Sequence, residues 1–159
     1  MSRAIPVLLT VLLVSGCRSV EVEKAIEVTD VQTGWYDAGL VENGQKNKLV
    51  PSISLRLHNI TQEQVSSVQL NAIFRRVNEP EAWGEHYVMA INREGLAPGA
   101  KTAPIVLRSN LGYTGTQSRM QMLQNREFVD AKVEIYGKSG SRTWVKLAEH
   151  QIGRELLTE

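Results

Sequence analysis

The stretch Pro51-Ser-Ile-Ser-Leu-Arg-Leu-His-Asn59 decides the fold of this chain. Its apolar side chains, at Ile53, Leu55 and Leu57, occupy every second position, and polar side chains stand between them. A period of two places alternate side chains on opposite faces of an extended strand, so one face can be buried while the other meets water. The stretch therefore predicts a half-buried β-strand.

Two more stretches repeat this alternation and extend the prediction to the rest of the chain. Residues 68–74 place Val, Leu, Ala and Phe at alternate positions, and residues 129–135 do the same with Val, Ala, Val and Ile. Seven short strands at regular spacing predict an all-β fold, an antiparallel immunoglobulin-like β-sandwich. The weaker strand patterns cover residues 25–36, 85–92, 103–109 and 142–150.

The segments between the expected strands carry turn signals. Glycines in residues 94–99 and 137–140 supply the positive φ that tight turns need. The second of these turns lies between two strand patterns and predicts a hairpin from Lys132 to Leu147. Residues 41–48 are polar and predict a surface loop.

One segment has the pattern of a helix. Residues 117–125 lack β-branched side chains and carry Met120 and Leu123 at a helical spacing, with Thr116 before them as an N-cap. We therefore expect one short helix, packed over an open end of the sandwich.

The first residues of the chain have the layout of an export signal. One positive charge, at Arg3, precedes an uncharged run from Ala4 to Val14, and small residues follow. This run is shorter than the roughly 20 residues that a helix needs to cross a bilayer, whereas it fits the hydrophobic region of a secretory signal. We expect residues 1–16 to be a signal peptide.

The end of this segment, Val14-Ser15-Gly16-Cys17, resembles the bacterial lipobox, in which a branched apolar residue and two small residues precede a cysteine. The resemblance implies cleavage behind Gly16 and a lipid on Cys17 that anchors the protein to an envelope membrane, facing the periplasm. It favours the outer membrane, because Arg18 stands where an aspartate would retain the protein in the inner one. Residues 17–24 would then be a lipidated tether, and residues 25–159 the sandwich domain.

Composition excludes several classes of function. The 18 Lys and Arg residues are balanced by 17 Asp and Glu residues, so charge gives no reason to expect a nucleic-acid partner. Cys17 is the only cysteine, which excludes disulfides and cysteine-based metal sites within the domain. The domain must be held together by its core.

A second resemblance concerns the domain itself. Residues 52–59, the strand pattern of residues 65–76 and the turn Gly95-Leu-Ala-Pro-Gly99 are similar to immunoglobulin-like bacterial lipoprotein domains of the FxLYD type. In those domains an asparagine closes one strand and a Leu-x-Pro-Gly turn precedes a later one. The Phe-x-Leu-Tyr-Asp signature itself is absent from the chain. The resemblance implies a fold and no activity.

Catalytic motifs are missing from the sequence. It contains no Gly-x-Ser-x-Gly elbow, no phosphate-binding glycine loop and no His-Glu-x-x-His. The histidines, His58, His86 and His150, stand far apart and lack the spacing of metal ligands. We expect neither metal nor cofactor, and no enzymatic activity.

Three aromatic residues are the candidate binding residues. The expected register of the hairpin places Tyr136 and Trp144 as a cross-strand pair on its outer face. Such a pair could anchor a protein interface or could only stiffen the sheet. Tyr113 lies in the glycine-containing loop of residues 109–116, which could present backbone N–H groups to a ligand or serve as a crossover between sheets.

Three functions remain open on this evidence. The leading hypothesis is a lipid-anchored, non-enzymatic accessory domain with a protein partner in the envelope. The second is a periplasmic module that binds a small ligand or a glycan through Tyr113 or Trp83. The third is an envelope hydrolase with His58 or His86 as its base.

Overall fold

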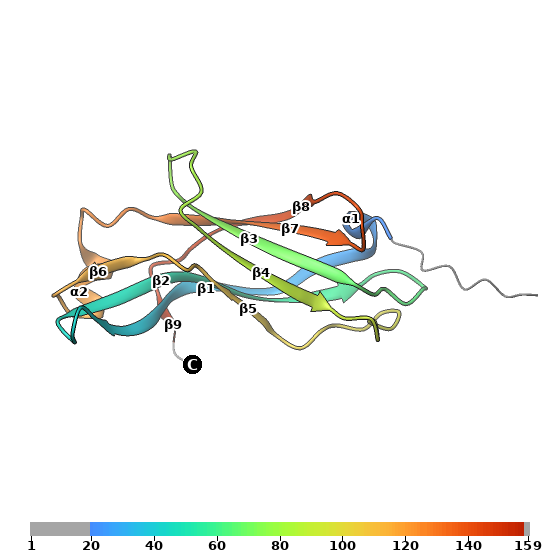
Figure 1. The fold of residues 1–159 in the computed structure, drawn as a ribbon, viewed down its shortest axis with the longest axis horizontal. Helices are drawn as coiled ribbons and strands as arrows, with labels where there is room; N and C mark the ends of the chain where they lie inside the picture. The colour runs from blue at the N-terminus through green and yellow to red at the C-terminus, as the bar shows by residue number, and fades with distance from the viewer. Residues whose placement is uncertain (1–19, 158–159) are drawn as a thin grey trace, which may run out of the picture.

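The computed structural model describes residues 20–157 and shows two β-sheets packed face to face (Figure 1). One sheet has the order β5-β2-β1-β9, with β6 beside β2, and the other has the order β4-β3-β7-β8. The predicted all-β sandwich is confirmed. Its elements are α1 (Val22–Ala25), β1 (Ile26–Val41), β2 (Lys46–Asn59), β3 (Val68–Arg76), β4 (Gly84–Ile91), β5 (Ile105–Arg108), β6 (Tyr113–Gly115), α2 (Arg119–Gln124), β7 (Ala131–Ser139), β8 (Val145–Gln151) and β9 (Leu156–Leu157).

All seven expected strands are present, and the hairpin of β7 and β8 is confirmed. Two further strands, β6 and β9, have only 3 and 2 residues, which is too short for a periodic pattern. β6 pairs with β2 inside the segment expected to be a loop, and β9 runs parallel to β1 beside Trp35. The predicted surface loop of residues 41–48 is a tight turn, because β1 continues to Val41 and β2 begins at Lys46.

The alternating side chains form the core between the sheets. Ile53, Leu55 and Leu57 of β2 are fully buried. From the opposite sheet they meet an equally buried set, which comprises Leu70, Ala72, Phe74, Val133 and Ile135. At ~25 cal/mol per Å² of apolar surface removed from water, this layer is the main source of stability.

One end of the core is aromatic. Trp35 of β1 is fully buried, and its ring lies against Phe128 at 4.5 Å, Tyr113 at 5.7 Å and Trp83 at 6.2 Å between ring centroids. Tyr113 also contacts Trp83 at 4.9 Å. Tyr113 and Phe128 line a common hollow with Met122 of α2, so this cluster lies at the end of the sandwich where α2 lies.

The predicted helix is present as α2, with a different cap and a different buried face. Ser118, and not Thr116, is the N-cap, and it forms a capping box with Gln121. Met122 and Leu123 are buried, whereas Met120, which was expected to pack inward, is 52% exposed. The later start turns the helix, so that Met122 takes the place assigned to Met120.

The packed domain begins earlier than expected. Residues 20–24 were assigned to the tether, but α1 begins at Val22, and Val22 and Ala25 are buried in the core. Val20 packs against the same core. The signal peptide and Cys17 lie outside the described residues.

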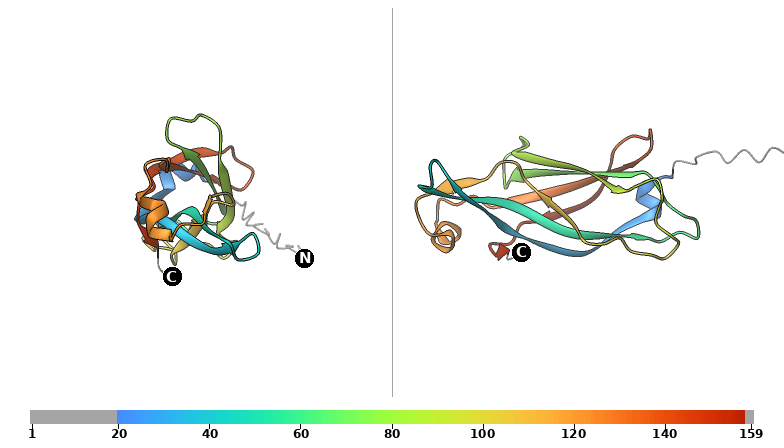
Figure 2. Two further views of the ribbon diagram at one scale, coloured as in Figure 1. Left: turned by 90° about the vertical axis from the view of Figure 1, so that its left-hand side faces the viewer. Right: turned by 60° about the horizontal axis from the view of Figure 1, so that its bottom comes forward.

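The molecule is elongated along its strands (Figure 2). β2, with 14 residues, extends for about 45 Å. α1 and the turn between β7 and β8 lie at one end, while α2 and the turn between β1 and β2 lie at the other (Figures 1 and 2). Neither helix of the described chain, with 4 and 6 residues, could span a membrane.

Candidate interaction surface

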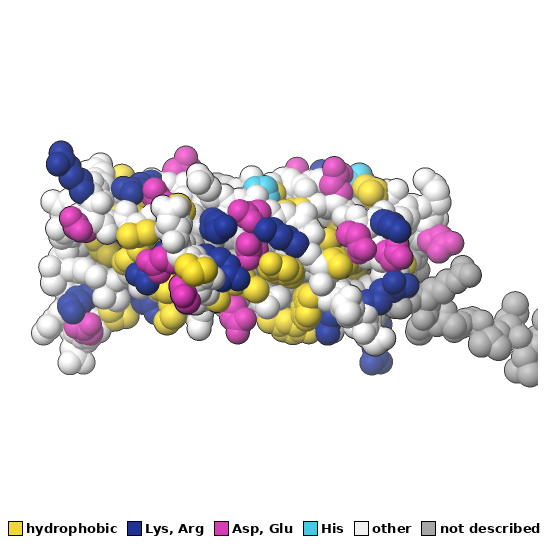
Figure 3. Space-filling model, turned by 90° about the horizontal axis from the view of Figure 1, so that it is seen from above, with side chains coloured by type: hydrophobic (Ala, Val, Ile, Leu, Met, Phe, Trp, Pro, Cys, Tyr) yellow, Lys and Arg dark blue, Asp and Glu magenta, His cyan; other side chains and the backbone are white. Residues whose placement is uncertain are grey.

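The solvent-facing side of the β4-β3-β7-β8 sheet, here called the outer face, gathers most of the candidate residues. Strand register places its side chains in cross-strand rows. Seen from above relative to Figure 1, charged side chains of both signs are interspersed with hydrophobic ones (Figure 3). The outer face consists of Glu85, Tyr87, Met89, Gln69, Asn71, Ile73, Arg75, Lys132, Glu134, Tyr136, Lys138, Lys146 and Glu149, with Trp144 directly before β8.

Trp144 forms the aromatic part of this surface with Tyr87. The two rings meet edge to face, with centroids 6.1 Å apart and planes at 80°. The Lys138 ammonium lies 4.9 Å from the centre of the Trp144 ring, a cation–π contact. Tyr87, Met89 and Trp144 are 55%, 48% and 38% exposed, so this group presents a large apolar area to solvent.

The predicted cross-strand pair of Tyr136 and Trp144 is wrong. β7 continues to Ser139 and the turn begins at Gly140, which has a φ of 57°. The longer strand makes Lys146 the register partner of Tyr136 and leaves Trp144 near Lys138. Both aromatic side chains remain on the outer face, in different contacts.

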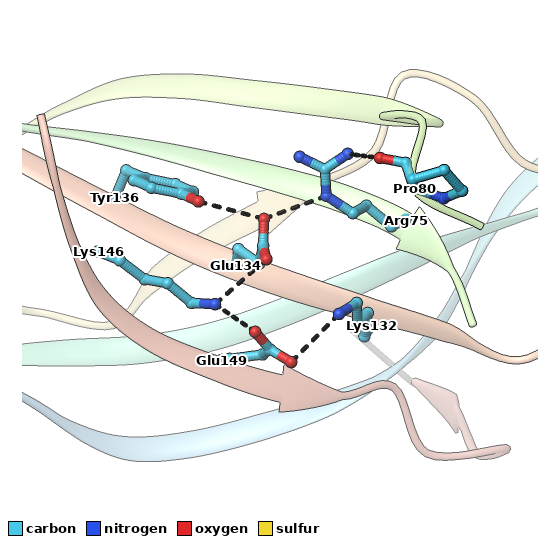
Figure 4. Close-up of polar contacts among 7 residues, drawn as sticks. All are labelled: Arg75, Pro80, Lys132, Glu134, Tyr136, Lys146 and Glu149. Atoms are coloured by element: carbon cyan, nitrogen blue, oxygen red, sulfur yellow. Dashed lines mark hydrogen bonds and ion pairs between the residues drawn. The ribbon is translucent and has the colours of Figure 1, made fainter. Parts of the chain in front are cut away.

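Tyr136 belongs to a polar network centred on Glu134 (Figure 4). The Glu134 carboxylate accepts hydrogen bonds from Arg75 Nε at 3.1 Å, Lys146 Nζ at 3.2 Å and the Tyr136 hydroxyl at 3.3 Å. Lys146 also pairs with Glu149, which in turn pairs with Lys132 at 3.3 Å. The network joins β3, β7 and β8 and holds the charged side chains of the outer face in place.

The environment of Glu134 favours its ionised form. Burial raises the pKa of this carboxyl, since its exposed fraction is only 8%, but the hydrogen bonds from Arg75 and Lys146 outweigh burial and lower the pKa overall. The pKa of Lys146 is raised, first by its hydrogen bond with Glu149 and then by its hydrogen bond with Glu134. The outer face therefore keeps a fixed pattern of charges at neutral pH.

Two amide oxygens on β3 have no hydrogen-bond partner and are shielded from solvent. They are Gln69 Oε1 and Asn71 Oδ1. In register, Gln69 lies between Met89 and Lys138, and Asn71 lies between Tyr87 and Tyr136. A buried acceptor without a donor costs about 1–3 kcal/mol.

Tyr113 lies in a different part of the molecule, in the aromatic end of the core. Its hydroxyl donates a hydrogen bond to the Val129 carbonyl at 3.2 Å, and its ring contacts Trp35 and Phe128. It also lines an open hollow of about 170 Å³ together with Thr114, Gly115, Gln117, Met122, Asn125, Glu127 and Phe128. The predicted crossover between sheets is wrong, because β5 before this loop and β6 after it both pair with β2 in one sheet.

The histidines do not come together. His58 Nδ1 lies 3.4 Å from Glu27 Oε2, and His86 Nδ1 contacts the Arg108 backbone at 2.9 Å to its oxygen and 3.1 Å to its nitrogen. His58 and Thr61 line a common hollow, but the Thr61 hydroxyl donates to Asn59 Oδ1 at 2.8 Å. Between residues 20 and 157, no three His, Cys, Asp or Glu side chains are placed to hold a metal ion.

Sequence reasoning missed Tyr87, Met89 and Lys138. The alternation of Glu85, Tyr87 and Met89 with smaller side chains was a usable signal, since it marks one face of the strand. The fold and its outer face define a β-sandwich with an ordered, aromatic and charged sheet surface. The sequence matches no known protein family and no characterised protein.

Proposed function

We propose that this protein is a lipid-anchored component of a bacterial envelope, most consistent with the outer membrane, that binds a partner protein through its outer face and catalyses no reaction. The observation that carries the binding role is the exposed group of Trp144, Tyr87 and Met89. Tryptophan and tyrosine are the side chains that most often dominate protein interfaces.

Order in the outer face supports this role. The Trp144 ring is held by Tyr87 and Lys138, and the Glu134 network fixes the neighbouring strands. A surface that is rigid before binding loses less side-chain entropy when a partner arrives. The lipid on Cys17 would hold this surface near the membrane, where several acyl chains give stable anchoring.

The anchor is tested by labelling cells with a palmitate analogue. The wild-type protein and a Ser19→Ala control should both incorporate the label, whereas Cys17→Ala should lose it and leave the membrane fraction. The physical reason is that Cys17 is the only thiol to which the diacylglycerol can be attached. Equal labelling of Cys17→Ala and the wild type would overturn the anchor.

The binding role is tested by photocrosslinking in cells from position 144. We expect one discrete adduct with another protein from this position. Val106 on β5 is a matched control, since it is 45% exposed on the other sheet, and it should give only background. A diffuse background from both positions would contradict binding through the outer face.

A ligand-binding module is the weaker alternative. The hollow beside Tyr113 measures about 170 Å³, below the roughly 300 Å³ at which small-molecule pockets begin. The Tyr113 ring and hydroxyl are also occupied by contacts within the core. A hydrolase is less supported still, because the Thr61 hydroxyl beside His58 is bonded to Asn59.

A further inference from the structure

β4 is an edge strand with unusually little protection. In its sheet it has one neighbour, β3. Natural edge strands are commonly protected by lysine, proline or charged side chains that prevent pairing with another chain. The sequence of β4 from His86 to Ile91, His-Tyr-Val-Met-Ala-Ile, contains none of these. The pairing of β4 with β3 has one irregularity, a register shift between the pair Gln69–Met89 and the pair Val68–Ile91 near the end of β4.

The side of β4 that faces away from β3 is occupied at Glu85 and offers unpaired backbone groups further along the strand. The Glu85 N–H donates to Asn110 Oδ1 at 3.1 Å, on the side away from β3. Backbone groups of alternate residues point the same way in a strand, so the N–H and C=O groups of Tyr87 and Met89 also point away from β3. Both residues have side chains that are about half exposed. An extended strand is the structure that complements such an edge.

The charges around this edge identify the strand that fits it. Glu85 lies near the beginning of β4, Arg93 lies just beyond its end, and both side chains are exposed. Within residues 20–157, neither takes part in an ion pair. Antiparallel pairing of β4 with β4 of a second copy brings Glu85 of each copy toward Arg93 of the other. The uncharged centre of each strand then faces the uncharged centre of the second copy.

We propose that β4 pairs with β4 of a second copy of this chain, antiparallel about a two-fold axis at Val88. Tyr87 then lies opposite the second copy's Met89, and each pair exchanges two backbone hydrogen bonds. The two β4-β3-β7-β8 sheets become one continuous sheet of eight strands, and Tyr87 and Met89 stay on its outer face. Such an interface uses the same patch on both chains, as two-fold symmetry requires.

Two-fold pairing also determines where the ends of the chains lie. β4 runs along the long axis of the molecule, so antiparallel pairing directs the two α1 ends in opposite directions (Figure 1). A dimer with two lipid anchors would therefore lie with its long axis along the membrane. The pairing itself does not need the anchor.

Sedimentation equilibrium of the full chain in density-matched detergent tests the proposal through a charge reversal. Glu85→Arg and Arg93→Glu should each weaken dimerisation by about tenfold or more, since each places like charges together twice. The double variant should restore dimerisation to within about threefold of the wild type. No other partner would restore it in this way. A monomeric wild type, or a double variant no better than the singles, would overturn the proposal.

A proline provides a second test of the backbone pairing. Met89→Pro removes an N–H that points away from β3, a position where edge strands accept proline, and it should abolish the dimer. Met89→Ala keeps the N–H and should still dimerise. A Met89→Pro variant that folds, as judged by cooperative thermal unfolding, and still dimerises would exclude β4 as the interface. Dimerisation that persists in Cys17→Ala separates this inference from the proposed anchor.

Discussion

Replacement of Asn59 by alanine is expected to lower the free energy of unfolding by about 3 kcal/mol. Asn59 closes β2 and is fully buried. Its amide nitrogen donates to the carbonyls of Glu63 at 2.8 Å and Leu96 at 2.9 Å, and its oxygen accepts from the Thr61 N–H at 2.9 Å and the Thr61 hydroxyl at 2.8 Å. Alanine leaves these groups without partners and opens a void beneath them.

Chemical denaturation monitored by tryptophan fluorescence measures this effect. Asn92→Ala is a matched control at the same end of the molecule, because the exposed Asn92 side chain accepts one bond, from the Glu94 N–H at 3.0 Å, and its loss should cost under about 1 kcal/mol. Asn59→Asp keeps the size of the side chain but directs an ionised oxygen at carbonyls, so it should be as unstable as Asn59→Ala at pH 7. Acidification should restore part of its stability, since protonation returns a donor. Equal stability of Asn59→Ala and Asn92→Ala would contradict this role.

Asn59 closes a strand that could be predicted from the sequence, as could the other long strands. Alternation in residues 51–59 reports burial directly, because each side chain either faces the core or does not. The same holds for residues 68–74 and for the hairpin of β7 and β8. Local patterns therefore identified every strand of 4 residues or more.

The contents of the outer face could not be predicted in the same way. Which residues lie opposite one another depends on where the turn after β7 begins, and a shift of two residues replaced the expected Tyr136 and Trp144 pair. Tyr87 meets Trp144 only because β4, β3 and β7 are neighbours, which no local pattern states. The alternation in residues 129–135 places Glu134 on the solvent-facing side of its strand, but hydrogen bonds from three donors on β3, β7 and β8 accompany its near burial.

The final prediction concerns the pH dependence that Glu134 gives to stability. Because the folded protein lowers the pKa of Glu134, ionised Glu134 stabilises the fold at every pH above the ordinary pKa of glutamate, about 4.3. This stabilisation is lost as pH falls from the ordinary pKa through the lowered pKa, because Glu134 then becomes protonated in the folded protein as well as in the unfolded protein. Glu134→Gln should therefore be less stable than the wild type by about 2 kcal/mol at pH 7, because Arg75 and Lys146 lose their shared acceptor.

The difference between the wild type and Glu134→Gln should shrink as pH is lowered, since the wild type loses the same charge that the variant lacks. Denaturation curves between pH 7 and the acid limit of folding measure this convergence. Glu81→Gln, at an exposed position in the loop before β4, should follow the wild type at every pH. A gap between Glu134→Gln and the wild type that stays constant with pH would mean that packing, and not the ionised carboxylate, is what Glu134 contributes. Convergence would show that the ionised carboxylate is what Glu134 contributes to stability.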